Sequence, residues 1–265
     1  PSSDPGRPTP VMAALAYRIH DHAIDHALFD LLHPGDAPEK KVVGVMGGHR
    51  MRRDEDDFLR VARLGWRLAR RGFFVTTGGG PGAMEAANLG AYLAGYEAEA
   101  LEAAVALLAE RPNYDEAGYV ERAYAVRERF PDGRPSLAIP TWFYGHEPSN
   151  LFARHVAKYF ANSLREDGLL GIARHGVIFA PGSAGTVQEV FMDAAQNHYA
   201  TFGAVSPMVF FDRRFWTETV PAYRLLTTLA DGHAYRNLIA VTSDVDAAVA
   251  FVEAHAPIPK EDLSA

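Results

Sequence analysis

Two glycine-rich segments have the composition of a phosphate-binding loop. The first reads Thr77-Gly78-Gly79-Gly80-Pro81-Gly82-Ala83-Met84-Glu85, with four glycines in five positions. Glycine lets the backbone approach a ligand closely, and the first turn of a following helix offers unpaired N–H groups to an anion. Residues 78–82 are therefore predicted to bind a phosphate group.

The second segment reads Pro181-Gly182-Ser183-Ala184-Gly185-Thr186-Val187-Gln188-Glu189. Gly185 and Thr186 open a predicted helix, so their N–H groups and the threonine hydroxyl are suited to a phosphate. Glu189 lies one helical turn further on, on a face that can point back at the ligand. The alternative is a plain glycine turn followed by an acidic residue that the helix dipole favours. A second glycine-rich loop at another strand end weighs against that alternative.

The first loop also matches a dinucleotide-binding spacing, G-x-G-x-x-A, at Gly78, Gly80 and Ala83. That fingerprint normally follows the first strand of the fold, and an acidic residue ends a strand about 20 residues later. Here the loop follows the second predicted strand, and the chain 20 residues later is helical. A nicotinamide-dependent oxidoreductase is therefore the least favoured of the enzyme classes.

The elements that must position these loops alternate between strand and helix. Short apolar runs predict strands at 41–46, 73–77, 136–139, 176–180, 208–211 and 238–241. Helical periodicity predicts helices at 11–32, 54–71, 83–95, 149–165, 186–198, 215–230 and 244–255. Residues 96–134 interrupt the alternation with two charged helical stretches, 97–110 and 116–129, which we interpret as an inserted helical hairpin facing solvent.

This alternation predicts an α/β fold with a doubly wound parallel, Rossmann-like sheet, an inserted helical hairpin and an N-terminal helix. The expected division is an N-terminal tail and helix at 1–40, the Rossmann-like domain at 41–256 and a C-terminal tail at 257–265. In such sheets ligands bind beyond the carboxyl ends of the strands, at the point where the strand order reverses. Both glycine-rich loops are expected at that edge.

The composition excludes several classes of function. The chain of 265 residues has no cysteine, which excludes disulfides, thiolate metal sites and a cysteine nucleophile. A formal net charge of −7 argues against nonspecific nucleic-acid binding, which needs a basic face. No apolar run is long enough to span a bilayer, and residues 1–10 lack the pattern of a signal peptide. We therefore expect a cytoplasmic protein without a nucleic-acid or membrane partner.

His22 and His26 have the one-turn spacing of a zinc-binding pair. No third ligand stands out near them in the sequence, so a polar helix face is favoured and no metal site is predicted. Trp142, Phe143 and Tyr144 have the side chains to stack on a nucleotide base or, alternatively, to plug the edge of the sheet. His49, at the end of a strand, fits either a ligand contact or a turn.

The two loops together resemble the LOG family of nucleoside 5′-monophosphate phosphoribohydrolases. The family's P-G-G-x-G-T-x-x-E signature is met by Pro181, Gly182, Gly185, Thr186 and Glu189. Three further motifs are similar to those of its bacterial nucleotide 5′-monophosphate nucleosidases, the PpnN group. They are Gly47-Gly48-His49, Gly80-Pro81-Gly82-Ala83-Met84-Glu85-Ala86 and Glu147-Pro148-Ser149-Asn150. The four motifs follow in the same order over residues 42–197.

The resemblance implies hydrolysis of the N-glycosidic bond of a nucleoside monophosphate, without a cofactor, to free base and ribose 5-phosphate. Such cleavage passes through an oxocarbenium-like state that a nearby carboxylate stabilises, which is the role expected of Glu189. The resemblance also implies a homodimer or higher homo-oligomer. The residues expected to bind the phosphate and nucleoside are Gly47, Gly48, Gly79, Gly80, Gly82, Met84, Glu85, Glu147, Asn150, Gly182, Ser183, Gly185 and Thr186.

Two positions depart from the family pattern. Ser183 stands where the signature has its second glycine, which should alter phosphate binding rather than abolish it. The family's catalytic arginine, about fifteen residues before the signature proline, falls on Glu166 by a count without gaps. A one-residue shift brings Arg165 into place, and Arg154 is the alternative. These departures leave open a non-catalytic nucleotide-binding module on the same fold.

Overall fold

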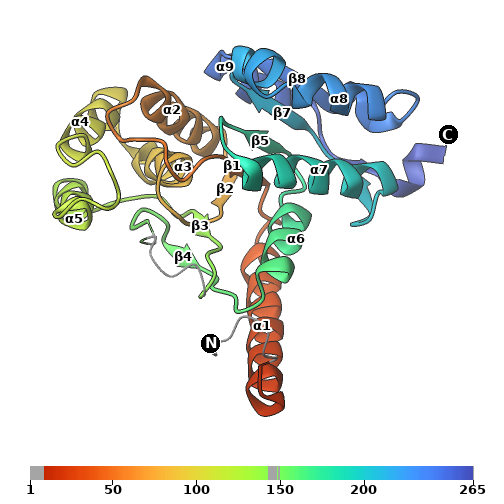
Figure 1. Cartoon of the computed structure of the whole chain (residues 1–265), viewed down its shortest axis with the longest axis horizontal. Coiled ribbons are helices and arrows are strands. Elements are labelled where there is room, and N and C mark those ends of the chain that lie inside the picture. Colours follow the sequence, from red (N-terminus) through yellow and green to blue (C-terminus); the bar gives the residue numbers. More distant parts are fainter. Residues whose placement is uncertain (1–8, 143–147, 149, 265) are drawn as a thin grey trace.

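The computed structural model describes residues 9–142, 148 and 150–264. Within these residues, seven parallel strands form one sheet in the order β4-β3-β2-β1-β5-β7-β8 (Figure 1). The strands are β1 (Val42–Met46), β2 (Phe74–Thr77), β3 (Leu137–Ala138), β4 (His155–Val156), β5 (Val177–Phe179), β7 (Met208–Phe211) and β8 (Ile239–Thr242). The predicted doubly wound α/β fold is confirmed.

The strand order reverses at β1, which lies between β2 and β5. Val43 pairs with Val75 on one side, and Val45 pairs with Ile178 on the other. The chain builds outward from β1 through β2, β3 and β4, then returns to β5 and continues to β8. The loops after β1, β2 and β5 therefore meet at one edge of the sheet, where a doubly wound fold binds its ligand.

Alternating strand residues feed two apolar cores, one on each face of the sheet. Val43 and Val45 pack with one set of helices, whereas Val42 and Met46 pack with the other. The first set is α2 (Asp56–Arg70), α3 (Ala83–Tyr92), α4 (Ala98–Leu108), α5 (Tyr119–Arg129) and α9 (Val245–Ala254). The second is α1 (Val11–Leu32), α6 (Asn162–Ile172), α7 (Ala184–Tyr199) and α8 (Ala222–Leu229). A short 3-10 turn, Leu93–Gly95, extends α3.

The inserted hairpin, α4 and α5, is more than a solvated insert. Leu101, Leu108 and Val126 are buried in the same core as α2 and α3. Tyr119, at the start of α5, donates to the carboxylate of Glu85 at 2.5 Å, and Arg53 lies over the ring of Tyr119. The expectation that these helices simply face solvent is wrong, because their apolar stripes complete the core beside α2.

The predicted helix 149–165 is wrong. The chain there forms strand β4, which pairs with β3 through Leu137 and His155, and helix α6 begins only at Asn162. Tertiary contacts decide this: the Asp21 carboxylate of α1 accepts the N–H groups of Phe160 at 2.9 Å and Ala161 at 2.8 Å. These bonds hold the segment before α6 in a non-helical path that local periodicity does not reveal.

Two smaller differences lie near the C-terminus. The predicted helix 215–230 is divided into a π-helical turn, Phe215–Thr219, and α8, because Pro221 between them has no N–H to donate. The segment predicted as a tail, 257–265, begins with β9 (Ile258–Pro259), which pairs with β6 (Ala204–Val205). The 3-10 turns Ala234–Leu238 and Lys260–Ser264 complete the elements.

Across the described ranges, no helix combines the length and apolarity needed to cross a membrane.

Candidate functional site

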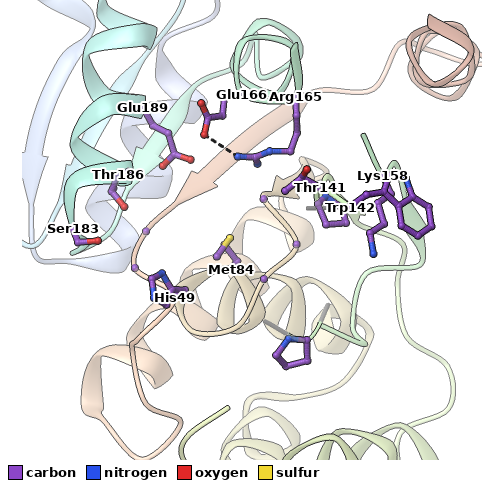
Figure 2. Close-up of a pocket in the computed structure, with 18 residues that line it drawn as sticks. His49, Met84, Thr141, Trp142, Lys158, Arg165, Glu166, Ser183, Thr186 and Glu189 are labelled. Atoms are coloured by element: carbon purple, nitrogen blue, oxygen red, sulfur yellow. Dashed lines mark hydrogen bonds and ion pairs between the residues drawn. The ribbon is translucent and has the colours of Figure 1, made fainter. Parts of the chain in front are cut away.

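A cavity of about 440 Å³ opens at the switch point, beyond the carboxyl ends of β1, β2 and β5 (Figure 2). Ten of the residues expected from the sequence line it: Gly47, Gly48, Gly79, Gly80, Met84, Arg165, Ser183, Gly185, Thr186 and Glu189. The two segments, about 100 residues apart in the chain, thus form one site. The cavity is large enough for a ligand of nucleotide size.

Close backbone packing joins the loops. The N–H of Gly48 donates to the carbonyl of Pro181 at 2.9 Å, and the N–H of Ala83 donates to the carbonyl of Gly48 at 3.1 Å. Gly82 has φ +69°, and a Cβ there would lie 2.4 Å from the Gly48 oxygen. A side chain at this position would therefore push apart the loop after β1 and the loop after β2. Gly82 thus supports the cavity without lining it.

The amino end of α7 faces the cavity and carries the signature loop. Ser183 precedes the helix, and Ser183 and Gly185 are exposed, whereas Thr186 is 5% exposed. A Cβ on Gly182 would lie 2.1 Å from the Thr186 Oγ1, so the loop requires glycine at 182. By contrast, nothing lies within 4 Å of a Cβ built on Gly185. The first-turn N–H groups of α7 lie next to the threonine hydroxyl and are chemically suited to an anion.

Glu189, one turn into α7, points into the cavity (Figure 2). Burial raises the pKa of its carboxyl from an ordinary 4.5 to about 7. The positive charge of Arg165 opposes this rise, and the negative charge of Glu166 adds to it. A carboxyl that titrates near neutrality is suited to accept or donate a proton during a reaction.

Arg165 and Glu166 lie together at the start of α6 and both line the cavity. Arg165 is 6% exposed, and its Nη2 donates to Glu166 Oε1 at 3.1 Å (dashed in Figure 2). Its Nε donates to Asn162 Oδ1 at 2.8 Å, while Gln188 donates to Glu166 Oε2 at 3.0 Å. These bonds fix an arginine and a carboxylate beside Glu189. The family's catalytic arginine was expected at either of these two adjacent positions. The structure brings both Arg165 and Glu166 to the cavity.

The alternative arginine, Arg154, is directed elsewhere: its Nη1 donates to the carbonyl of Gly133 at 2.9 Å. Among the described residues around the cavity, Arg165 is the arginine that lines it. The sequence spacing alone did not separate these two candidates, because the predicted helix 149–165 placed both on one element.

Besides Gly82 and Gly182, two more of the expected residues that the structure describes, Glu85 and Asn150, lie outside the cavity lining. Glu85 is 1% exposed and accepts from Arg53 Nε at 2.8 Å, so it forms a buried ion pair beneath the loop. Asn150 donates to the carbonyl of Gly80 at 3.3 Å and to Asn88 Oδ1 at 3.1 Å. Both residues support the first loop rather than face a ligand. Glu147 falls outside the described residues, as do Phe143 and Tyr144.

The rim opposite the signature loop contains residues that the sequence analysis did not single out. Lys158 and Thr141 line the cavity, and Lys158 Nζ lies 4.2 Å from the centroid of the Trp142 ring. Trp142 is 48% exposed and stacks on Phe160 at 5.7 Å. The buried hydroxyl of Thr141 finds no hydrogen-bond partner among the residues the structure describes. This rim offers an aromatic face, a cation and an unsatisfied hydroxyl to a ligand.

His49 also lines the cavity, so its strand-end position brings it to the ligand side. No group of three histidine or acidic residues suited to a metal ion occurs in the described part of the chain. The zinc-spaced pair instead makes a mutual contact, with the Nε2 atoms of His22 and His26 3.2 Å apart. The cavity therefore offers hydrogen-bond donors, charges and an aromatic ring to a ligand.

Comparison with known proteins finds one family model and several solved structures that resemble this chain. The model of the SLOG cluster4 family matches residues 40–97, which contain β1, β2 and the first glycine-rich loop. No curated protein sequence matches the chain.

Several solved structures share the fold over 82% of the chain. The molybdenum cofactor binding protein of Rippkaea orientalis is 15% identical, with a TM-score of 0.51 and 98% of its chain covered. The Moco carrier protein of Chlamydomonas reinhardtii is 18% identical, with a TM-score of 0.51 and 97% covered. The protein TM1055 is 21% identical, with a TM-score of 0.50 and 99% covered. These likenesses show a shared fold, the doubly wound parallel α/β sheet described above.

Proposed function

We propose that this protein hydrolyses the N-glycosidic bond of nucleoside 5′-monophosphates, as the resemblance of its motifs to LOG-family and PpnN-type nucleosidases implies. One observation carries the proposal. Glu189, whose pKa is raised to about 7, shares a cavity with the amino end of α7, whose first-turn N–H groups are suited to a phosphate. A nucleotide bound by its phosphate at Ser183–Thr186 would have its ribose near this carboxylate, one helical turn away.

The remaining lining residues suit the rest of such a substrate. Trp142 presents an aromatic face on which a base can stack, and Thr141 and Lys158 offer polar contacts beside it. Arg165 supports the anionic form of Glu189, because its positive charge lowers the pKa of that carboxyl. Ser183 and Thr186 lie on one side of the cavity and Trp142 and Lys158 on the other (Figure 2), an arrangement that suits the two ends of a nucleotide.

The chemistry follows from this placement. As the bond between C1′ and the base nitrogen breaks, the electron pair leaves with the base, which takes a proton from solvent. The Glu189 carboxylate stabilises the positive charge that develops on C1′ and on the ribose ring oxygen, O4′. A water molecule then forms the new C–O bond and gives its proton to Glu189. The products are free base and ribose 5-phosphate.

Chromatography of the reaction products tests the proposal. The protein is incubated with AMP, GMP, CMP, UMP and a cytokinin riboside monophosphate, and free base is measured. We expect release from at least one nucleotide, its loss in Glu189→Gln, and a rate that rises with pH through about 7 as Glu189 ionises. Nucleotide binding without base release from the wild-type protein would contradict the proposal.

A second candidate function is binding without turnover. Two of the structural neighbours are named as a binding protein and a carrier protein for the molybdenum cofactor, and Ser183 departs from the glycine of the hydrolase signature. Calorimetry with AMP, ribose 5-phosphate and inorganic phosphate separates the two functions. A carrier or sensor would bind one of these ligands in both the wild type and Glu189→Gln, and would release no base.

A further inference from the structure

Helix α1 has an apolar face that the rest of the described chain leaves uncovered. Its inner side contributes Asp21, Leu28 and Leu32, all buried. On its outer side, large apolar residues are exposed: Met12 by 76%, Leu15 by 51%, Ile19 by 62% and Phe29 by 61%. The helix also projects away from the sheet and its covering helices (Figure 1). An exposed apolar patch of this kind marks an interaction surface.

The spacing of this outer face is that of a coiled coil. Among the exposed residues, one set follows alternating steps of three and four residues: Met12, Leu15, Ile19, His22, His26, Phe29 and, one residue past the helix end, His33. That is the a/d pattern of a heptad repeat, sustained along the whole 22-residue helix. A strip with this period fits a second helix that packs almost parallel or antiparallel to α1, rather than a strand or a flat surface.

We propose that the occupant is α1 of a second copy of this chain, antiparallel and related by a two-fold axis. In one antiparallel register Met12 meets Phe29 of the partner subunit, Leu15 meets His26 of the partner subunit, and Ile19 meets His22 of the partner subunit. The same three contacts recur on the other side of the axis, so the strip is complementary to itself. The rings of His22 and His26 then each pack on an aliphatic side chain.

The charges beside the strip support this orientation. On one flank of the strip, the antiparallel register places Arg18 opposite Asp25 of the partner subunit, and this pair occurs twice per dimer. On the other flank, Ala16 lies opposite Ala23 of the partner subunit. A parallel pair would instead oppose Asp25 and Asp30 and stack like histidines on one another, which is unfavourable. Asp25 is held on the flank because Tyr159 donates to its Oδ1 at 2.7 Å, and its second carboxylate oxygen suits the arginine.

The dimer would brace the candidate site. The inner face of α1 contacts the segment before α6: Asp21 accepts two backbone N–H groups there, and Tyr17 stacks on Phe160 at 4.2 Å. Helix α6 carries Arg165, which lines the cavity. A pair of α1 helices would therefore hold the arginine-bearing element of each subunit in place.

Sedimentation velocity on the purified chain tests the surface. We expect a two-chain species in the wild type, and Leu15→Glu/Ile19→Glu should raise its dissociation constant at least about 100-fold. Both side chains are exposed in the single chain, so circular dichroism should be unchanged. The matched control is Leu225→Glu/Leu229→Glu, two equally spaced exposed leucines of α8 at 53% and 51%, which should leave the dimer intact. A wild-type monomer, or a dimer that the α1 substitutions leave unchanged, would overturn the proposal.

Disulfide trapping tests the orientation, because the chain has no cysteine of its own. Met12→Cys/Phe29→Cys should form a covalent dimer on oxidation, whereas each single variant should stay uncrosslinked. Within one helix the two positions lie roughly 25 Å apart, too far for an internal bridge. Cross-linking of the single Met12→Cys variant as efficiently as the double variant would show a parallel pair and refute the antiparallel register.

Discussion

Replacing Glu189 by glutamine should make the protein more stable, and more so at high pH. The folded-state pKa of this carboxyl is raised from 4.5 to about 7, so between those values the folded state binds a proton that the unfolded state does not. Stability is therefore lost as pH rises through this window. A pKa difference of this size corresponds to about 3 kcal/mol of unfolding free energy. Because the Glu189 side chain is only partly buried, solvent screening reduces the expected loss of stability to about 2–3 kcal/mol.

Glutamine is nearly isosteric and stays neutral, so Glu189→Gln escapes this loss. Relative to wild type we expect a gain below about 1 kcal/mol at pH 5 and about 2–3 kcal/mol at pH 8, or roughly 5 °C in Tm. Thermal and urea unfolding at both pH values measure it. The matched control is Glu128→Gln on the exposed face of α5, which should show no such pH dependence. An equal Tm difference at pH 5 and pH 8 would refute the reasoning, because it would mean that the Glu189 carboxyl ionises as readily in the folded protein as in the unfolded chain.

Further predictions concern the charges and the glycines of the site. Glu166→Gln removes a negative charge that raises the pKa of Glu189, so the pH midpoint of base release should move to lower pH. Arg165→Met removes the opposing positive charge, so the midpoint should move to higher pH; shifts in the same direction would contradict the electrostatic account. Gly182→Ala places a Cβ 2.1 Å from the threonine hydroxyl of its loop and should destabilise the fold by about 1–3 kcal/mol, with weakened phosphate binding. Gly185→Ala meets nothing within 4 Å and should lose little stability in urea unfolding, so equal losses in the two variants would argue against the packed loop.

Local patterns in the sequence were enough to predict most elements and the edge of the sheet that holds the cavity. Helix α1 was predicted with its observed bounds, and strand β7 likewise, because each has a strong period or a compact apolar run between breakers. The glycine-rich loops were predicted to meet, since the carboxyl ends of parallel strands share one edge. Thr186 and Glu189, which follow the second glycine-rich loop along the chain, were placed at the cavity in this way.

Contacts between distant segments decided what local patterns could not. The path of residues 150–161 depends on bonds from Asp21, more than 130 residues earlier in the chain, so its periodicity gave a false helix. Glu85 stands in a loop motif that suggests a ligand contact, yet Arg53 draws it into a buried ion pair. Lys158 belongs to no motif at all and reaches the cavity only through the order of the sheet.

The sequence by itself determined the α/β class, the two glycine-rich loops and the presence of Glu189 at their shared edge, because these follow from backbone sterics and helix spacing within short segments. Only the tertiary structure decided that Arg165 rather than Arg154 faces the cavity, and that Glu189 titrates near pH 7. Both depend on burial and on charges from separate elements, and these arise only when the chain is folded.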